Sequence, residues 1–169
     1  MATHRAIDEL ISEADNHCHR LANQLLHTFS FVPDDKLHWM PSPSARSAIQ
    51  IVAHCGVANK MICRRLRNQP EEATTREEMM EKAKLIIDSI QTREEAVELL
   101  QQSVSEVSEA LQTLTQDSLD IIPQNPIRPL PMLFWMFQPG NHMMGHAYQI
   151  DYLETIWGDM EFRVAPPKS

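Results

Sequence analysis

Two histidines, His142 and His146, stand four residues apart in the last third of the chain. An α-helix completes a turn in about 3.6 residues, so side chains at this spacing leave the same face of a helix. Two imidazole nitrogens aimed at one point form half of a metal site. His54 lies on the apolar face of another expected helix and should point inward, as a third ligand would. Three imidazoles leave a divalent metal with open coordination positions, which is typical of catalytic rather than structural sites.

A metal held only by neutral imidazoles keeps its full charge, so it can lower the pKa of a bound water or hold a thiol as the thiolate. Both routes give a nucleophile at neutral pH. Hydrolases with a His-Glu-x-x-His motif place a general base directly after the first histidine, whereas Met143 follows His142 here. This difference favours activation of a thiol over proteolysis.

Two glutamines are candidates to contact the histidines and so orient their rings. Gln50 precedes His54 by one helical turn, and Gln149 follows His146 by three residues. The alternative for both is an ordinary place in the polar rim of the protein. The remaining histidines, among them His17, are expected at the surface.

Long amphipathic segments are predicted to position these residues. The first covers residues 3–30, and the second covers residues 47–67 and carries His54. A short helix should begin near Thr75, and a third long helix should run over residues 92–114. Serine or threonine three residues before glutamine or glutamate forms a capping box at two of these starts, Ser47 to Gln50 and Thr92 to Glu95.

The last helix is apolar, carries His142 and His146, and should end at Gly158. Pro139-Gly140 inside this segment must kink the helix or restart it. Before it, four prolines forbid regular helix across a long crossover connection: Pro123, Pro126, Pro129 and Pro131. We therefore predict an all-α four-helix bundle with a long crossover connection, formed by a single domain over residues 1–163 and followed by a flexible tail over residues 164–169.

Composition narrows the possible functions. The chain has 169 residues, only 4 glycines and a net charge of −8, which favours helices and argues against nucleic-acid binding. No segment approaches the length of a membrane span, and the start of the chain lacks a secretory apolar region. Three cysteines without a Cys-x-x-Cys pair fit a reducing compartment. We expect a cytoplasmic protein that has no membrane or nucleic-acid partner.

Two blocks of the sequence resemble a known family. Residues 32–54 contain a Leu-x-Trp-x-Pro loop that leads through serine and an Ile-x-x-His helix to His54. Residues 141–150 contain His-x-x-x-His followed by glutamine. Both blocks are similar to the DinB-like, or YfiT-like, group of four-helix-bundle proteins regarded as metalloenzymes. The resemblance implies that His54, His142 and His146 form the metal-binding triad.

The same resemblance implies a divalent metal, nickel or zinc, and a homodimer. Members of the group include thiol-dependent S-transferases and isomerases. The sequence departs from the family at Gly145, where many members have histidine, and at Ala147-Tyr148, where many have Arg-Gly, so a substrate contact from those positions does not carry over. Gln149 matches.

The sequence is thus interpreted as a metal-dependent enzyme whose three-histidine site activates water or a thiol, as in a hydrolase or a thiol S-transferase. Its partners would be a small-molecule substrate and a low-molecular-weight thiol. The alternative is a non-catalytic helical bundle that binds a small molecule or a partner, with the histidines hydrogen-bonded in the core. A dimerisation module with an apolar interface and no accessible pocket is a third possibility.

Overall fold

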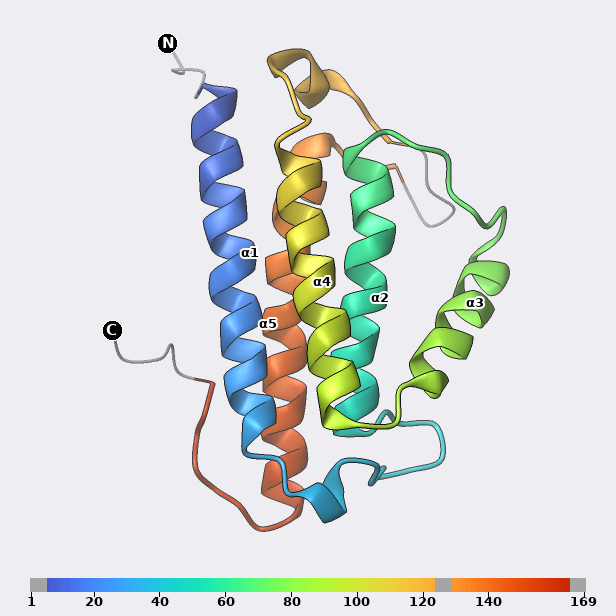
Figure 1. Ribbon diagram of the computed structural model, residues 1–169, viewed down its shortest axis with the longest axis vertical. Helices are drawn as coiled ribbons and strands as arrows, with labels where there is room; N and C mark the ends of the chain where they lie inside the picture. Colours follow the sequence, from blue (N-terminus) through green and yellow to red (C-terminus); the bar gives the residue numbers. More distant parts are fainter. Residues whose placement is uncertain (1–5, 124–128, 165–169) are drawn as a thin grey trace.

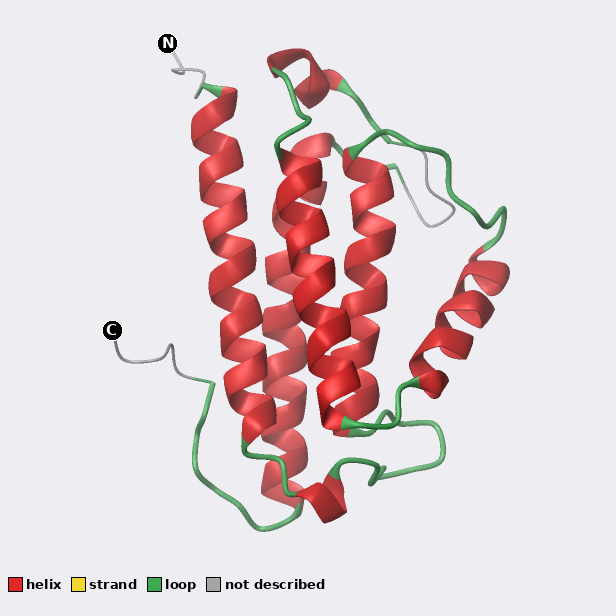
Figure 2. Ribbon diagram, viewed as in Figure 1, coloured by secondary structure: helices red, strands yellow, loops and turns green. Residues whose placement is uncertain are grey.

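The computed structural model describes residues 6–123 and 129–164. Helices dominate this part of the chain, and the described residues contain no strand (Figure 1, Figure 2). The α-helices are α1 (Ile7–Ser30), α2 (Ala48–Leu66), α3 (Arg76–Ser89), α4 (Arg93–Leu111) and α5 (Met132–Ile156). Two short 3-10 helices, η1 (Asp34–Lys36) and η2 (Gln116–Asp120), lie in the connections. The predicted all-α fold is confirmed.

Four long helices share one axis, and α3 lies outside them against α2 (Figure 1). Around the bundle, α5 packs between α1 and α2, and α4 completes the ring against the same two helices. In the view of Figure 1, α1 and α5 run downward, whereas α2 and α4 run upward. The helix that carries His54 is therefore an antiparallel neighbour of the helix that carries His142 and His146.

The long crossover lies elsewhere than predicted. Since α2 and α4 are parallel, the chain must return along the bundle between them, and residues 67–92 with α3 make this return (Figure 1). The proline-rich segment before α5 joins the ends of α4 and α5 on the same side of the bundle. Prolines mark where a helix cannot form, but they do not indicate which ends of the bundle a loop connects. Pro126 lies outside the described residues.

The helix starts follow the predicted capping chemistry. The Ser47 side chain accepts a hydrogen bond from the Gln50 backbone, and the Gln50 side chain accepts one from the Ser47 backbone at 3.1 Å. Thr92 and Glu95 form the same reciprocal pair at the start of α4. Each box satisfies two of the backbone N–H groups that a helix start leaves without a partner.

Two predicted boundaries shift, and a third is as predicted. The first helix begins at Ile7 rather than residue 3, and residues 1–5 lie outside the described residues. The helix predicted to reach residue 114 ends at Leu111, although Leu114 is still buried after the turn. At the end of α5, Gly158 adopts a positive φ of 92°, which favours glycine after a helix terminus, as predicted.

The helix α5 does not restart at Pro139; it continues through it. The neighbouring Gly140 allows α1 and α5 to approach closely, because a Cβ atom there would lie 2.4 Å from the ring of His17. His17, expected at the surface, is partly exposed there. Its ring is half-buried, with Nε2 placed 2.9 Å from Oδ1 of Asn141.

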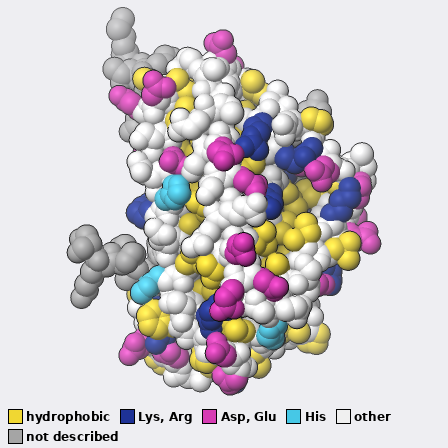
Figure 3. All heavy atoms as spheres, viewed as in Figure 1, with side chains coloured by type: hydrophobic (Ala, Val, Ile, Leu, Met, Phe, Trp, Pro, Cys, Tyr) yellow, Lys and Arg dark blue, Asp and Glu magenta, His cyan; other side chains and the backbone are white. Residues whose placement is uncertain are grey.

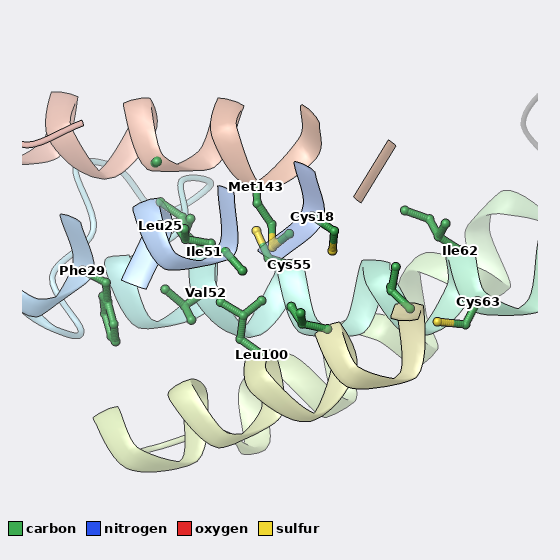
Figure 4. Close-up of a cluster of buried hydrophobic side chains, with 14 of the residues drawn as sticks. Cys18, Leu25, Phe29, Ile51, Val52, Cys55, Ile62, Cys63, Leu100 and Met143 are labelled. Atoms are coloured by element: carbon green, nitrogen blue, oxygen red, sulfur yellow. The ribbon is translucent and has the colours of Figure 1, made fainter. Parts of the chain in front are cut away.

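Most of the core is one extended cluster of apolar side chains between the long helices, and a smaller cluster joins α2 to α3. Figure 4 shows Leu25, Cys55 and Met143, from α1, α2 and α5, directed into the larger cluster. Val164, predicted to begin the flexible tail, is instead buried, and its carbonyl accepts a hydrogen bond of 2.8 Å from Gln24. Residues 165–169 lie outside the described residues. Among the described helices, none is long and apolar enough to cross a membrane.

Candidate metal centre

The three predicted ligands meet inside the bundle. His54 comes from the middle of α2, and His142 and His146 come from successive turns of α5. The Nε2 atom of His142 lies 3.2 Å from that of His54 and 3.1 Å from that of His146. One ligand atom from each of the three rings lies within 4.8 Å of the other two, so the described residues contain one group with the spacing to hold a metal ion.

The two separations from His142 match the spacing of ligands around one metal ion. Imidazole nitrogens bind zinc at about 2.0–2.1 Å, so two ligands of a tetrahedral ion lie about 3.3 Å apart. The observed distances of 3.1 Å and 3.2 Å are close to this value. The donor set is three nitrogens without a carboxylate or thiolate, which suits zinc and nickel among other transition metals.

Burial keeps the imidazoles neutral. Desolvation, followed by the charge of Arg46, lowers the pKa of His54 to about 3. Desolvation likewise lowers the pKa of His142 to about 4, with smaller contributions from His146 and Arg46. The pKa of His146 is lowered by desolvation as well. Neutral rings have free lone pairs at neutral pH, as metal ligation requires.

Gln149 sets the tautomer of one ligand. Its Oε1 atom lies 2.7 Å from Nδ1 of His146, and a carbonyl oxygen only accepts, so Nδ1 carries the proton. The lone pair of His146 then resides on Nε2, which faces the other two rings. The Nδ1 atom of His142 is buried and has no hydrogen-bond partner among the described residues.

Gln50 is placed differently. Its side-chain oxygen completes the capping box of α2, and its amide group donates to Oδ1 of Asp88 on α3 at 3.3 Å. Both ends of the amide are therefore engaged away from the histidine rings. Gln50 fixes the start of α2 and its contact with α3.

A cavity of about 1240 Å³ opens onto the histidines between α2, α3, α5 and the loop before α2. His54 and His142 line it, and Gln149 lies at its edge. Its walls are largely apolar, with Met61, Met79, Phe134 and Trp135 among them. Figure 3 shows hydrophobic side chains gathered between α3 and the long helices. An apolar cavity with a few converging polar groups is typical of a small-molecule site.

Two arginines of this cavity have no counterpart in the sequence-based prediction. Arg65 is 5% exposed, donates to Oε1 of Glu71 at 2.6 Å and lies over the ring of Trp135 at 4.5 Å. Arg46 is half-buried in the loop before α2. In the sequence, Arg46 is simply a single basic residue between a loop rich in serine and proline and the cap residue of α2, which does not mark it as important.

A family model described as the DinB superfamily matches residues 17–150 of the chain. This span includes the three histidines and the whole of α2, α3 and α4. No curated protein matches the chain.

Proposed function

The chain belongs to the DinB superfamily, and on this premise we propose that it is a metal-dependent enzyme that activates a thiol. The observation that carries the proposal is the convergence of three histidines, two of which line a mostly apolar cavity. His54, His142 and His146 would hold a divalent ion, nickel or zinc. A bound ion would supply Lewis acidity, which lowers the pKa of a coordinated thiol or water.

The surroundings of the histidines favour a thiol over water as the nucleophile. Hydrolysis profits from a general base beside the water, and no carboxylate of the described residues belongs to the histidine group. Asp88, which lines the same cavity, is already engaged by Lys84 and Gln50. Thiol activation needs less assistance, because a metal ion alone stabilises the thiolate.

The thiol must come from outside the protein. Cys18, Cys55 and Cys63 are free but buried, and desolvation raises the pKa of each far above its usual range. None of them supplies a thiolate at neutral pH. We therefore propose a low-molecular-weight thiol and an electrophilic small molecule as the two substrates.

Elemental analysis of untagged protein tests the site. We expect close to one equivalent of metal in the wild type and in His38→Ala, an exposed histidine outside the cluster. His54→Ala and His142→Ala should lose the metal, because two imidazoles bind a divalent ion far more weakly than three. A thiol-consumption assay with a reactive aryl halide should then show turnover only in the two metal-containing proteins.

Two results would contradict the proposal. Metal that persists in both cluster variants would place the ion elsewhere. A wild type without metal after incubation with zinc and nickel, and with unchanged stability in His146→Ala, would favour a non-catalytic bundle that binds small molecules.

A further inference from the structure

We propose that Arg46 binds a carboxylate group of the small molecule that enters the cavity, so that the natural substrate is an apolar carboxylic acid or a thiol that carries a carboxylate. Only the word substrate rests on the proposed function. The carboxylate site itself needs only the cavity and the arginine. Arg46 is thus proposed as a specificity-determining residue.

The first observation is that Arg46 lacks an acidic partner. It forms no hydrogen bond or ion pair with any described residue, although the chain has 23 acidic and only 15 basic residues. Other arginines of the protein are paired with carboxylates at short distance: Arg64 with Glu72, Arg65 with Glu71, Arg93 with Asp34 and Arg163 with Asp159. A half-buried guanidinium without a counter-charge is unfavourable unless a ligand supplies one.

The second observation is where this charge lies. Arg46 lines the same cavity as His54 and His142, directly before the first turn of α2. The positive end of the α2 dipole adds to its field. The charge of Arg46 also contributes to the lowered pKa of all three histidines, so it acts on the whole cluster. An anion held there would share the cavity with His54 and His142.

Two carboxylates line the cavity together with Arg46, those of Glu81 and Asp88, and neither forms an ion pair with it. Asp88 lines the cavity from α3, but its Oδ1 accepts from Gln50 and its Oδ2 pairs with Lys84. These two contacts use both oxygens of the carboxylate. The arginine therefore faces the cavity as an open anion-binding group.

A carboxylate matches this site better than a phosphate. One planar guanidinium binds the two oxygens of a carboxylate side by side, whereas a doubly charged phosphate usually recruits several cations or free backbone N–H groups. The capping box already occupies N–H groups at the start of α2. The remaining cavity wall, with Met61, Met79, Phe134 and Trp135, suits an apolar body attached to the carboxylate.

The test compares two probes that differ only in charge, 4-phenylbutyrate and 4-phenylbutanamide. Isothermal titration calorimetry gives the Kd of each for the protein as purified and after removal of metal by a chelator. We expect the wild type to bind the acid about tenfold more tightly than the amide in both forms, because a charge-assisted pair forms only with the acid. The Arg46→Gln variant should bind both probes equally, and Arg46→Lys should retain part of the preference.

Arg76→Gln serves as the matched control, since it removes one exposed arginine of α3 that does not line the cavity. It should keep the wild-type preference. Equal binding of both probes by the wild type, or a preference that survives in Arg46→Gln, would overturn the inference. A preference that disappears on chelation would also overturn it and would assign the carboxylate to the metal.

The metal proposal and this inference can fail separately. Protein that holds no metal but still distinguishes the acid from the amide through Arg46 contradicts the first and supports the second. To find which substrate carries the carboxylate, 3-mercaptopropionate and 2-mercaptoethanol are compared as thiols with a neutral aryl halide. A KM for the mercapto acid that rises in Arg46→Gln, with the KM for 2-mercaptoethanol unchanged, assigns it to the thiol. If both KM values stay unchanged, the carboxylate belongs to the electrophile, because the neutral aryl halide carries none.

Discussion

At the scale of single residues, Gln149 and Gln50 were both predicted to orient a metal-binding histidine, and only Gln149 contacts one. The Gln149 amide determines which nitrogen of His146 is protonated. Groups that hydrogen-bond to a metal ligand typically contribute 10–100-fold to metal affinity. We therefore expect Gln149→Leu to weaken zinc binding by about this factor in a competition titration with a chromophoric chelator. Gln50→Leu should lower stability through the lost cap while the zinc affinity stays within about threefold. Equal losses of affinity in the two variants would contradict this assignment.

Glu154 is a buried carboxyl near the end of α5, far along the helix from the histidines. It is 1% exposed, and its nearest cation is Arg163 at 3.5 Å. Desolvation raises its pKa from the ordinary 4.5 to about 7. Between these two values the unfolded chain loses its proton while the folded protein keeps it, so stability falls as the pH rises from about 4.5 to 7 and is constant above.

Glu154→Gln should remove this pH dependence. The amide resembles the protonated acid in shape and cannot ionise, so we expect similar stability of variant and wild type at pH 4 and a more stable variant at pH 8, by on the order of 2 kcal/mol. Urea denaturation over this pH range measures the difference. A variant that is less stable than the wild type at pH 8 would show that the Arg163 pair outweighs the desolvation.

The residues that could be predicted are those whose spacing alone carries information. Two histidines four apart share a helix face in any context, and a histidine on an apolar stripe points inward. Arg46 could not be found this way, because its importance depends on which carboxylates the folded chain leaves unpaired. The same applies to Gln50, whose two hydrogen bonds depend on where α3 packs.

At the scale of helices, propensity and capping predicted which segments form helices but not how they are connected. The capping boxes at Ser47 and Thr92 are local, since each involves four consecutive residues. The parallel arrangement of α2 and α4 is not local: it depends on α3 covering the cavity side of α2, where Val57 and Ile87 pack together. Periodicity assigned α3 correctly as a helix, but its role as the return connection follows only from the packing.

The two glycines inside α5 offer a matched comparison on one helix. A Cβ at Gly140 would meet the His17 ring, whereas a Cβ at Gly145 would meet nothing within 4 Å. We expect Gly145→Ala to stabilise the protein by about 0.5–1 kcal/mol through reduced backbone entropy of the unfolded chain. Gly140→Ala should instead destabilise it by about 1–3 kcal/mol through overpacking against α1.

Chemical denaturation of both variants measures these changes. If Gly140→Ala were as stable as Gly145→Ala, the close contact between α1 and α5 would not be required for folding.

At the scale of the whole molecule, the expected homodimer stays a prediction, and α5 offers a surface for it. Met144, Tyr148, Tyr152 and Ile156 follow at four-residue spacing and are 37%, 48%, 67% and 46% exposed. Residues 141–150, which include the first half of this stripe, contain no Lys, Arg, Asp or Glu, and charged residues are depleted at the centre of an interface. We propose that a second copy packs this stripe against itself about a two-fold axis.

Light scattering coupled to gel filtration tests this interface. Tyr148→Glu should convert a dimer to a monomer, whereas Leu85→Glu, a change at a still more exposed apolar side chain of α3, should not. A wild type that is monomeric at high micromolar concentration would contradict the proposal.

Metal binding should also act on the whole fold, because its ligands join segments that are far apart in the sequence. Between His54 on α2 and the pair on α5, the chain forms α3, α4 and the three connections that link these four helices. An ion that binds only the folded state stabilises it by about 2.7 kcal/mol when its free concentration is 100 times Kd. For a chain of this size, this corresponds to a rise in Tm of about 5–10 °C.

Differential scanning calorimetry with and without a chelator measures this rise. It should vanish in His142→Ala and persist in His38→Ala, since only the first variant removes a ligand. A Tm rise of equal size in both variants would mean that the ion binds outside the three-histidine cluster. An unchanged Tm in a wild type that contains metal would mean that the ion binds the unfolded chain as tightly as the bundle.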